Sequence, residues 1–168
     1  MQILTTKSWQ LILLVFISYF GSIELAEMDL EIVSIPLGIF SFFLIFFWYY
    51  SLGSFLYRKL ERRDRNLYVL FSINCLYLLC FFGYSYLTRS NAEEKPIVEA
   101  PIYVYAIGIY YLIAYFQMIY YLTSNIQSYF SEKVVQKKFG GSIPLFFLLI
   151  FIPIGVLLIQ PLLNEDFD

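Results

Sequence analysis

The sequence predicts an all-α fold, a polytopic bundle of transmembrane helices. Its 168 residues are 60% hydrophobic and 21% aromatic, and only 14% of them are charged, against about a quarter in soluble domains. The charged residues gather in short clusters that are separated by long uncharged stretches. Because a helix needs about 20 apolar residues to cross the hydrocarbon core of a bilayer, these stretches indicate membrane spans.

Five helices are expected, in a single transmembrane domain that covers residues 1–168. They lie at about 8–25, 32–57, 67–88, 101–129 and 143–163. The first stretch could instead be the apolar core of a cleaved signal peptide behind Lys7, which would leave four helices. A clear small-x-small cleavage pattern is missing, because Glu24 occupies the −3 position relative to Ala26. A retained first helix is therefore favoured.

The second and fourth helices are longer than a span requires, since they would measure about 39 Å and about 43 Å at 1.5 Å per residue. Both must tilt or protrude. A shift of 70 residues aligns 31–88 with 101–158 without a gap. The aligned identities include Gly38 with Gly108, Phe46 with Phe116 and Ser54 with Ser124. This similarity predicts a parallel repeat of two helical hairpins.

Small residues and one proline predict local helix geometry. Ser34 and Gly38 form a small-x-x-x-small pair, and Gly53 gives the second helix another point of close approach. In the fifth helix Pro153 lacks an N–H group, so the carbonyl of Leu149 loses its helical donor. We expect a kink there, with neighbouring hydroxyl groups satisfying the freed carbonyl.

The fourth helix carries a candidate polar stripe that recurs every seven residues. Its members are Tyr103, Tyr110, Gln117 and Ser124. Asn74 in the third helix is the other deep amide side chain, and it is expected to make an intramembrane polar contact across a helix interface. Two interpretations of the stripe remain: a buried contact surface, which is favoured, or a polar path or ligand-binding face.

A cytoplasmic basic cluster is expected between the second and third helices. It consists of Arg58, Lys59, Arg62, Arg63 and Arg65. The segment before the first helix and the connections on the same side together hold nine Lys and Arg residues, whereas the remaining connections and the C-terminal tail hold two. The positive-inside rule then places the N-terminus in the cytoplasm and the C-terminus outside. The cluster is interpreted mainly as a topology anchor, and alternatively as a site for anionic lipid headgroups or an acidic partner.

The residue inventory argues against an enzyme. The chain has no histidine, and no carboxylate lies well inside a predicted span, so neither an imidazole base nor an intramembrane acid pair is available. Cys75 and Cys80 are separated by about 7.5 Å of helical rise, which is too far for a disulfide. No catalytic residue, metal site or cofactor is expected, and the charge distribution indicates no nucleic-acid-binding face.

Two segments carry a resemblance to known sequences. The final FFLLIFIPIGVLLIQPLLN and the upstream IPLGIFSFFLIFFWYYSLGSFLYRKL resemble a group of small, uncharacterised multi-helix membrane proteins of Bacteroidetes-type bacteria, many of which end in an F-P-I-G-x-x-x-I-Q-P pattern. Here the pattern corresponds to Ile152, Pro153, Ile154, Gly155, Ile159, Gln160 and Pro161, with Ile152 in place of the aromatic residue. The resemblance implies a bacterial inner-membrane location and carries no known activity.

The function expected from these observations is that of a non-enzymatic accessory or scaffold protein of the membrane. It would act through helix–helix contacts, either with itself or with another membrane protein. The alternative is a small oligomeric channel or membrane-permeabilising effector that uses the polar stripe and the kink at Pro153. A third possibility is a tyrosine-lined pocket for a lipid or another apolar molecule.

Overall fold

The computed structural model describes residues 8–60, 64–89 and 102–165, and these residues form seven helices and no strand. In chain order the helices are α2 (Ser8–Glu27), α3 (Glu31–Lys59), α4 (Arg65–Arg89), α5 (Ile102–Tyr129), α6 (Glu132–Phe139), α7 (Ser142–Ile150) and α8 (Ile152–Glu165). The predicted all-α class is therefore confirmed. Four helices, α2 to α5, are long and apolar enough to cross a membrane, and α7 with α8 make a fifth segment if that bent pair counts as one span.

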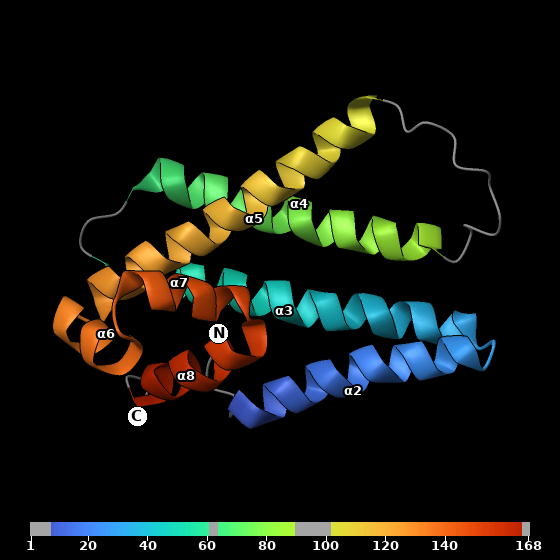
Figure 1. Cartoon of the computed structure of the whole chain (residues 1–168), viewed down its shortest axis with the longest axis horizontal. Coiled ribbons are helices and arrows are strands. Elements are labelled where there is room, and N and C mark those ends of the chain that lie inside the picture. The colour runs from blue at the N-terminus through green and yellow to red at the C-terminus, as the bar shows by residue number, and fades with distance from the viewer. Residues whose placement is uncertain (1–7, 61–63, 90–101, 166–168) are drawn as a thin grey trace.

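Helices α2 to α5 run alternately in opposite directions, which gives the bundle two ends (Figure 1). We call the end that carries Lys59, Arg65 and α6 the basic end. The opposite end, with Glu27 at the end of α2 and Asp29 in the turn before α3, is the acidic end. The four predicted helices that correspond to α2–α5 agree with the structure to within three residues at each boundary.

Small residues let α2, α3 and α4 approach closely near the acidic end. The hydroxyl of Ser34 donates to the carbonyl oxygen of Ser22 at 2.7 Å, and the hydroxyl of Tyr86 donates to Ser22 Oγ at 2.9 Å. A side chain at Gly38 would overlap the ring of Tyr86. The close approach predicted for Ser34 and Gly38 is thus confirmed, and it brings α4 as well as α2 against α3.

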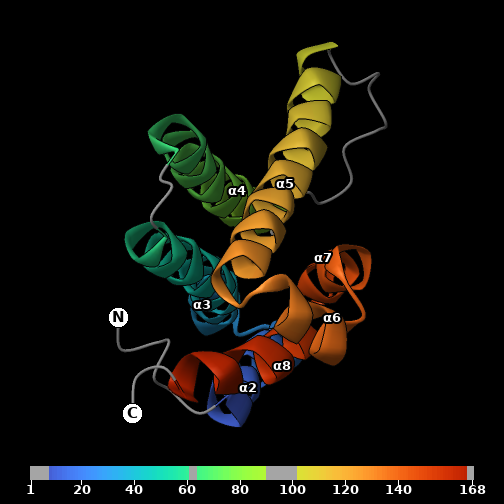
Figure 2. The same cartoon turned by 90° about the vertical axis from the view of Figure 1, so that its left-hand side faces the viewer.

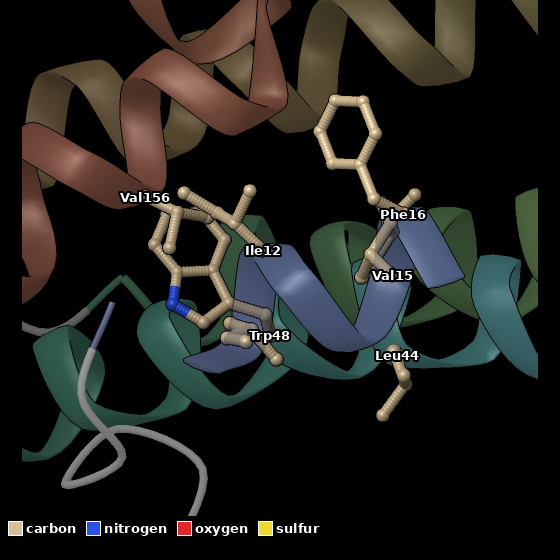
Figure 3. Close-up of a pocket in the computed structure, with 8 residues that line it drawn as sticks. Ile12, Val15, Phe16, Leu44, Trp48 and Val156 are labelled. Atoms are coloured by element: carbon tan, nitrogen blue, oxygen red, sulfur yellow. The ribbon is translucent and has the colours of Figure 1, made fainter. Parts of the chain in front are cut away.

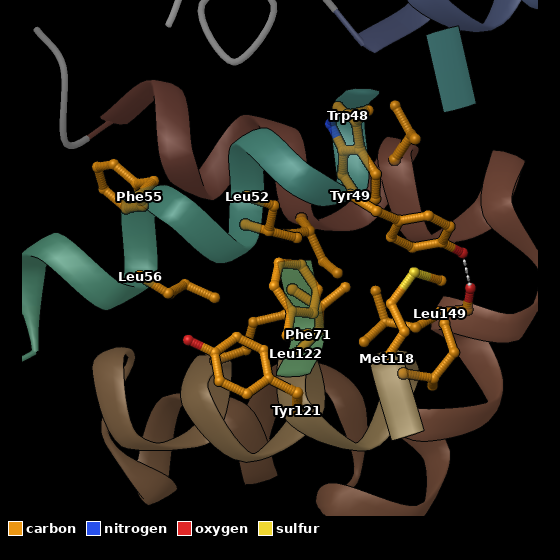
Figure 4. Close-up of a cluster of buried hydrophobic side chains, with 14 of the residues drawn as sticks. Trp48, Tyr49, Leu52, Phe55, Leu56, Phe71, Met118, Tyr121, Leu122 and Leu149 are labelled. Carbon is orange, nitrogen blue, oxygen red and sulfur yellow. Dashed lines mark hydrogen bonds between the residues drawn. The ribbon is translucent and has the colours of Figure 1, made fainter. Parts of the chain in front are cut away.

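The main core lies toward the basic end, where α3 packs against α4, α5 and α7 (Figure 4). Its fully buried large side chains include Trp48, Tyr49, Leu52, Phe55, Leu56, Phe71, Met118 and Leu122. Gly53 admits the ring of Phe71 against the backbone of α3. Phe71 in turn stacks on Tyr121 of α5, with ring centroids 4.5 Å apart. Aromatic packing therefore joins three helices at this level.

The N-terminal half of α5 extends away from the rest of the bundle. Eight of the ten residues from 104 to 113 are exposed, whereas buried positions recur from Ala114 to Ile126. Figure 2 shows α5 diverging from α4 and the rest of the bundle toward its N-terminal end. The half of α5 near the acidic end is thus largely uncovered by the other described helices.

A separate short helix, α6, follows α5 instead of an extension of it. Helix α5 ends at Tyr129, where the fourth helix was predicted to end, and Ser131 adopts a φ of 31°. Helix α6 ends at Gly140, whose φ of 76° is the left-handed conformation that favours glycine at a helix end. Lys137 and Lys138 lie in its last turn, where positive charge is favourable.

The predicted continuous fifth helix at 143–163 is wrong. The chain breaks at Phe151, and the axes of Ser142–Ile150 and Ile154–Leu163 differ by 115°. Nine residues of α7 rise about 14 Å, which is roughly half of the hydrocarbon thickness. Because the bend exceeds 90°, α8 runs back toward the basic end, where α2 begins (Figure 1).

Helix α8 packs against α2 and α3. Figure 3 shows Val156 of α8 close to Ile12 of α2 and to the indole of Trp48. A small apolar cavity of about 20 Å³ lies between these helices. Gly155 permits the tight return, because a Cβ there would lie 3.0 Å from the carbonyl oxygen of Leu148.

Candidate functional site

Asn74 of α4 joins two members of the predicted stripe on α5. The hydroxyl of Tyr110 donates to Asn74 Oδ1 at 3.0 Å, and Asn74 Nδ2 donates to the Oε1 atom of Gln117. Asn74 is buried, with 1% of its surface exposed. Tyr110 and Gln117 are two helical turns apart, so one amide bridges both of them. The predicted intramembrane contact of Asn74 is therefore present, and this geometry favours a contact surface.

The other two members of the stripe do not join this network. The side chain of Tyr103 lies outside the described residues. Ser124 is exposed and lines a cavity near the basic end. The stripe is thus divided into a hydrogen-bonded part around Asn74 and a cavity-lining part, with Gln117 belonging to both.

Two tyrosine hydroxyls meet the carbonyl groups at the break between α7 and α8. Tyr49 of α3 donates to the carbonyl oxygen of Leu149, and Tyr115 of α5 donates to that of Ile150 at 3.1 Å. Because Leu149 bears the carbonyl that Pro153 leaves without a helical donor, the expectation that a hydroxyl group satisfies this carbonyl is met. The side chain of Pro153 lies outside the described residues. The predicted kink is present, but it is a complete break at Phe151 with a change of direction of 115°.

Sequence reasoning missed the contact that fixes α8. Trp48 Nε1 donates to Gln160 Oε1 at 2.7 Å, and both side chains are buried. Gln160 was considered only as part of the C-terminal pattern. The signal that could have found it was an amide in an otherwise apolar run of a predicted span, which needs a partner as Asn74 and Gln117 do.

A cavity of about 250 Å³ lies between the end of α3, the start of α4 and the middle of α5. Its lining consists of Tyr57, Leu60, Asp64, Leu67, Gln117, Tyr120, Tyr121, Ser124 and Asn125. We call it the basic-end cavity. Asp64 begins α4, where its Oδ1 atom accepts hydrogen bonds from the backbone N–H groups of Asn66 at 2.9 Å and Leu67 at 3.1 Å. Asp64 is therefore the N-cap of α4.

The described members of the basic cluster lie around the same end of the bundle. Arg58 and Lys59 end α3, Arg65 begins α4, and all three are exposed. Arg62 and Arg63 lie outside the described residues. Lys137 and Lys138 of α6 are exposed at this end too. The described Lys and Arg residues of this end thus lie around the basic-end cavity.

Cys75 and Cys80 are both free, the first buried and the second exposed. No group of three or more His, Cys, Asp or Glu side chains that could hold a metal ion occurs in the part of the chain that the structure describes.

The long apolar helices and the polar contacts between them define the chain as a multi-pass α-helical membrane protein. Comparison with protein-family models, with curated proteins and with solved structures found no match.

Proposed function

We propose that the protein is a non-enzymatic accessory or scaffold protein that binds another membrane-embedded helix along the free half of α5. The observation that carries this proposal is the exposure of residues 104 to 107, four in succession. Successive helical residues point about 100° apart. Four exposed neighbours therefore mean that the helix is uncovered on all sides.

Two glycines support a helix as the partner. A Cβ at Gly108 of α5 or at Gly83 of α4 would meet nothing within 4 Å, whereas one at Gly38 or Gly53 would overlap a neighbouring ring. Glycine inside a helix costs roughly 0.5–1 kcal/mol relative to alanine. Small residues permit close approach of helix backbones in membranes. A partner backbone near Gly83 and Gly108 would account for glycine there, where no described residue makes a close contact.

Cross-linking in native membranes tests the proposal. In a background with Cys75 and Cys80 replaced by alanine, Ile109→Cys should form a cross-linked product, either a dimer of this chain or a heterologous complex. Ile17→Cys on α2 is the matched control, because Ile17 and Ile109 are both 59% exposed. Adding Gly108→Leu should abolish the product while leaving the helical circular dichroism unchanged. Equal cross-linking at positions 17 and 109, or none at either, would contradict the proposal.

The proposed location is a bacterial cytoplasmic membrane, with the basic end in the cytoplasm. The resemblance of the C-terminal pattern supports the membrane, and the distribution of Lys and Arg supports the orientation. The placement of the C-terminus outside depended on a continuous fifth span. With α7 and α8 as a bent pair, we propose instead that the C-terminus shares the cytoplasmic side with the N-terminus.

The second candidate function is a small oligomeric channel. The polar groups of Tyr110, Asn74 and Gln117 bond to one another, whereas a pore lining must stay wet across the whole span. The first function is therefore better supported. Robust ion leakage from liposomes that contain the purified protein, abolished by Gln117→Leu, would reverse this ranking.

A further inference from the structure

A cleft of about 360 Å³ lies between α3 and α4, and each helix contributes four residues to its lining. We propose that this α3–α4 cleft binds a lipid-soluble molecule with a flat ring and ring oxygens, that is, a quinone. The volume of the cleft falls in the usual range of about 300–1,000 Å³ for ligand sites, which are mostly apolar with a few polar groups. The proposal is independent of the partner helix proposed for α5.

Side chains of unequal size on the two helices form the α3–α4 cleft. Helix α3 contributes large aromatic rings, among them Phe43 and Phe47, whereas α4 contributes the small side chains of Ser72 and Cys75. Ser72 and Cys75 are three residues apart, so they lie on the same face of α4. Cys75 is 4% exposed and lies at the bottom of the cleft, while the neighbouring Leu76 is 63% exposed and borders it. The depression is thus built into the facing surfaces of two continuous helices.

The α3–α4 cleft is open to the bilayer. Both helices are long and apolar enough to span a membrane. Phe43, Phe47 and Tyr50 line the cleft on α3, and they are between 40% and 43% exposed. Tyr50 lies nine residues before Lys59, the end of α3, which corresponds to about 14 Å along the helix. A molecule dissolved in the lipid can therefore enter from the side, whereas a charged ligand would have to cross apolar surroundings to reach this depth.

The aromatic wall favours a rigid ring over an acyl chain or a helix. Lipid tails are as apolar as leucine, so a hydrocarbon chain gains little by leaving the bilayer for the cleft, and it loses conformational freedom when it is held there. A ring avoids that loss and packs on other rings. Phe43 and Phe47 are stacked, with centroids 5.5 Å and planes 9° apart, so a ligand ring can extend their stack. Close approach of a partner helix needs small residues on both walls, and α3 offers large rings.

Hydroxyl groups at one end of the cleft suit the oxygen of a quinone. Tyr50 lines the cleft on the side toward the basic end, and its hydroxyl interacts with those of Ser54 and Tyr68. The oxygen atoms of Ser54 and Tyr68 are 3.0 Å apart. Hydroxyl protons rotate to suit an acceptor, so this group can donate to a ring carbonyl. A carbonyl carries no formal charge, so it enters an apolar site at less cost than an ion does.

Three variants and two controls test the cleft. Phe47→Leu removes one ring of the stack, Tyr50→Phe removes the hydroxyl, and Ser72→Leu fills the space. Phe40→Leu is the matched control for Phe47→Leu, because Phe40 of α3 is 42% exposed, Phe47 is 41% exposed, and Phe40 does not line the cleft. Tyr84→Phe serves in the same way for Tyr50→Phe. Helical circular dichroism shows which variants fold, and Phe47→Leu changes an exposed side chain.

The probe is a short-chain benzoquinone in which every ring position is substituted, so that the thiol of Cys75 cannot add to the ring. The purified full-length protein is reconstituted in phosphatidylcholine nanodiscs and titrated with the quinone, and native mass spectrometry counts the quinone molecules bound to each chain. A saturated hydrocarbon of similar length, added as a competitor, distinguishes a ring site from a site for any apolar chain. The oligomeric state of the protein is read from the same spectra.

The wild-type protein should bind one quinone per chain, saturably and without displacement by the hydrocarbon. Phe47→Leu should weaken the binding about fivefold, as expected for the loss of one aromatic pair, and Tyr50→Phe about threefold, as expected for one hydrogen bond. Ser72→Leu should abolish it, and both controls should bind as the wild type does. The proposal is overturned by non-saturable uptake, by displacement with the hydrocarbon, by equal effects of Phe47→Leu and Phe40→Leu, or by a dimer that Phe47→Leu dissociates, which would make a second copy the occupant.

Discussion

The hydroxyl of Tyr49 on α3 donates to the carbonyl oxygen of Leu149 in the last turn of α7. These residues are 100 positions apart, and both are buried. Pro153 cannot donate to this carbonyl, so the contact replaces a helical hydrogen bond with one between helices. The bond thereby links the break in the C-terminal segment to the centre of the main core.

Tyr49→Phe should destabilise the protein, because it leaves the carbonyl of Leu149 buried without its donor. A buried acceptor that loses its partner costs about 1–3 kcal/mol. The free energy of unfolding in mixed detergent micelles measures the effect. Tyr84→Phe is the control, since Tyr84 is 69% exposed, and it should change stability by less than about 0.5 kcal/mol. A loss no larger in Tyr49→Phe than in Tyr84→Phe would mean that the carbonyl is satisfied by another group.

Gln117→Leu and Asn74→Leu should each lower thermostability in detergent, and their effects should not add. Hydrogen bonds between membrane helices average about 0.6 kcal/mol and reach about 1.7 kcal/mol. Since Asn74 holds both Tyr110 and Gln117, its replacement should cost more than that of Gln117. A double-mutant cycle measures the coupling. Unchanged melting of Gln117→Leu would count against the contact role of the stripe.

Gly53→Ala and Gly108→Ala should change stability in opposite directions. A Cβ at position 53 overlaps the ring of Phe71, and one at position 108 meets nothing within 4 Å. Overpacking a core costs about 1–3 kcal/mol, whereas alanine stabilises an uncrowded helix by up to about 1 kcal/mol. Melting temperatures of the two variants, compared with the wild type in the same detergent, provide the measurement. Stabilisation by Gly53→Ala would show that Phe71 can move aside.

Much of the fold could be predicted because a span is defined by local sequence. The apolar length of each stretch suffices to locate α2, α3, α4 and α5. The break before α6 could not be foreseen from apolarity, whereas the pair Gly140 and Gly141 was a usable signal for the end of α6. The predicted repeat of 31–88 and 101–158 stays a prediction.

The site was harder to predict, because its contacts join distant parts of the chain. The sequence identified Asn74 and Gln117 as deep amides, but their pairing depends on how α4 crosses α5. Likewise, Pro153 predicts a bend, while the donors to the carbonyl groups at the break, Tyr49 and Tyr115, come from two other helices. The basic-end cavity depends on three separate helices. No spacing within one segment could have revealed it.

The bent pair predicts that the C-terminus and the basic end lie on the same side of the membrane. Helix α7 is too short to cross, and the 115° bend directs α8 back toward the start of α2. The contact between Trp48 and Gln160 holds α8 in that position. A membrane-impermeant maleimide, applied to intact spheroplasts, measures the sidedness of single cysteines in a background without Cys75 and Cys80.

Met28→Cys in the turn at the acidic end should be labelled in intact spheroplasts, because Met28 is 65% exposed. Lys133→Cys on α6 should react only after lysis. A cysteine added after the last residue should behave like the cysteine at position 133, since α8 returns to that end of the bundle. If it is labelled together with the cysteine at position 28, the C-terminal segment crosses the membrane, and the re-entrant arrangement of α7 and α8 is wrong.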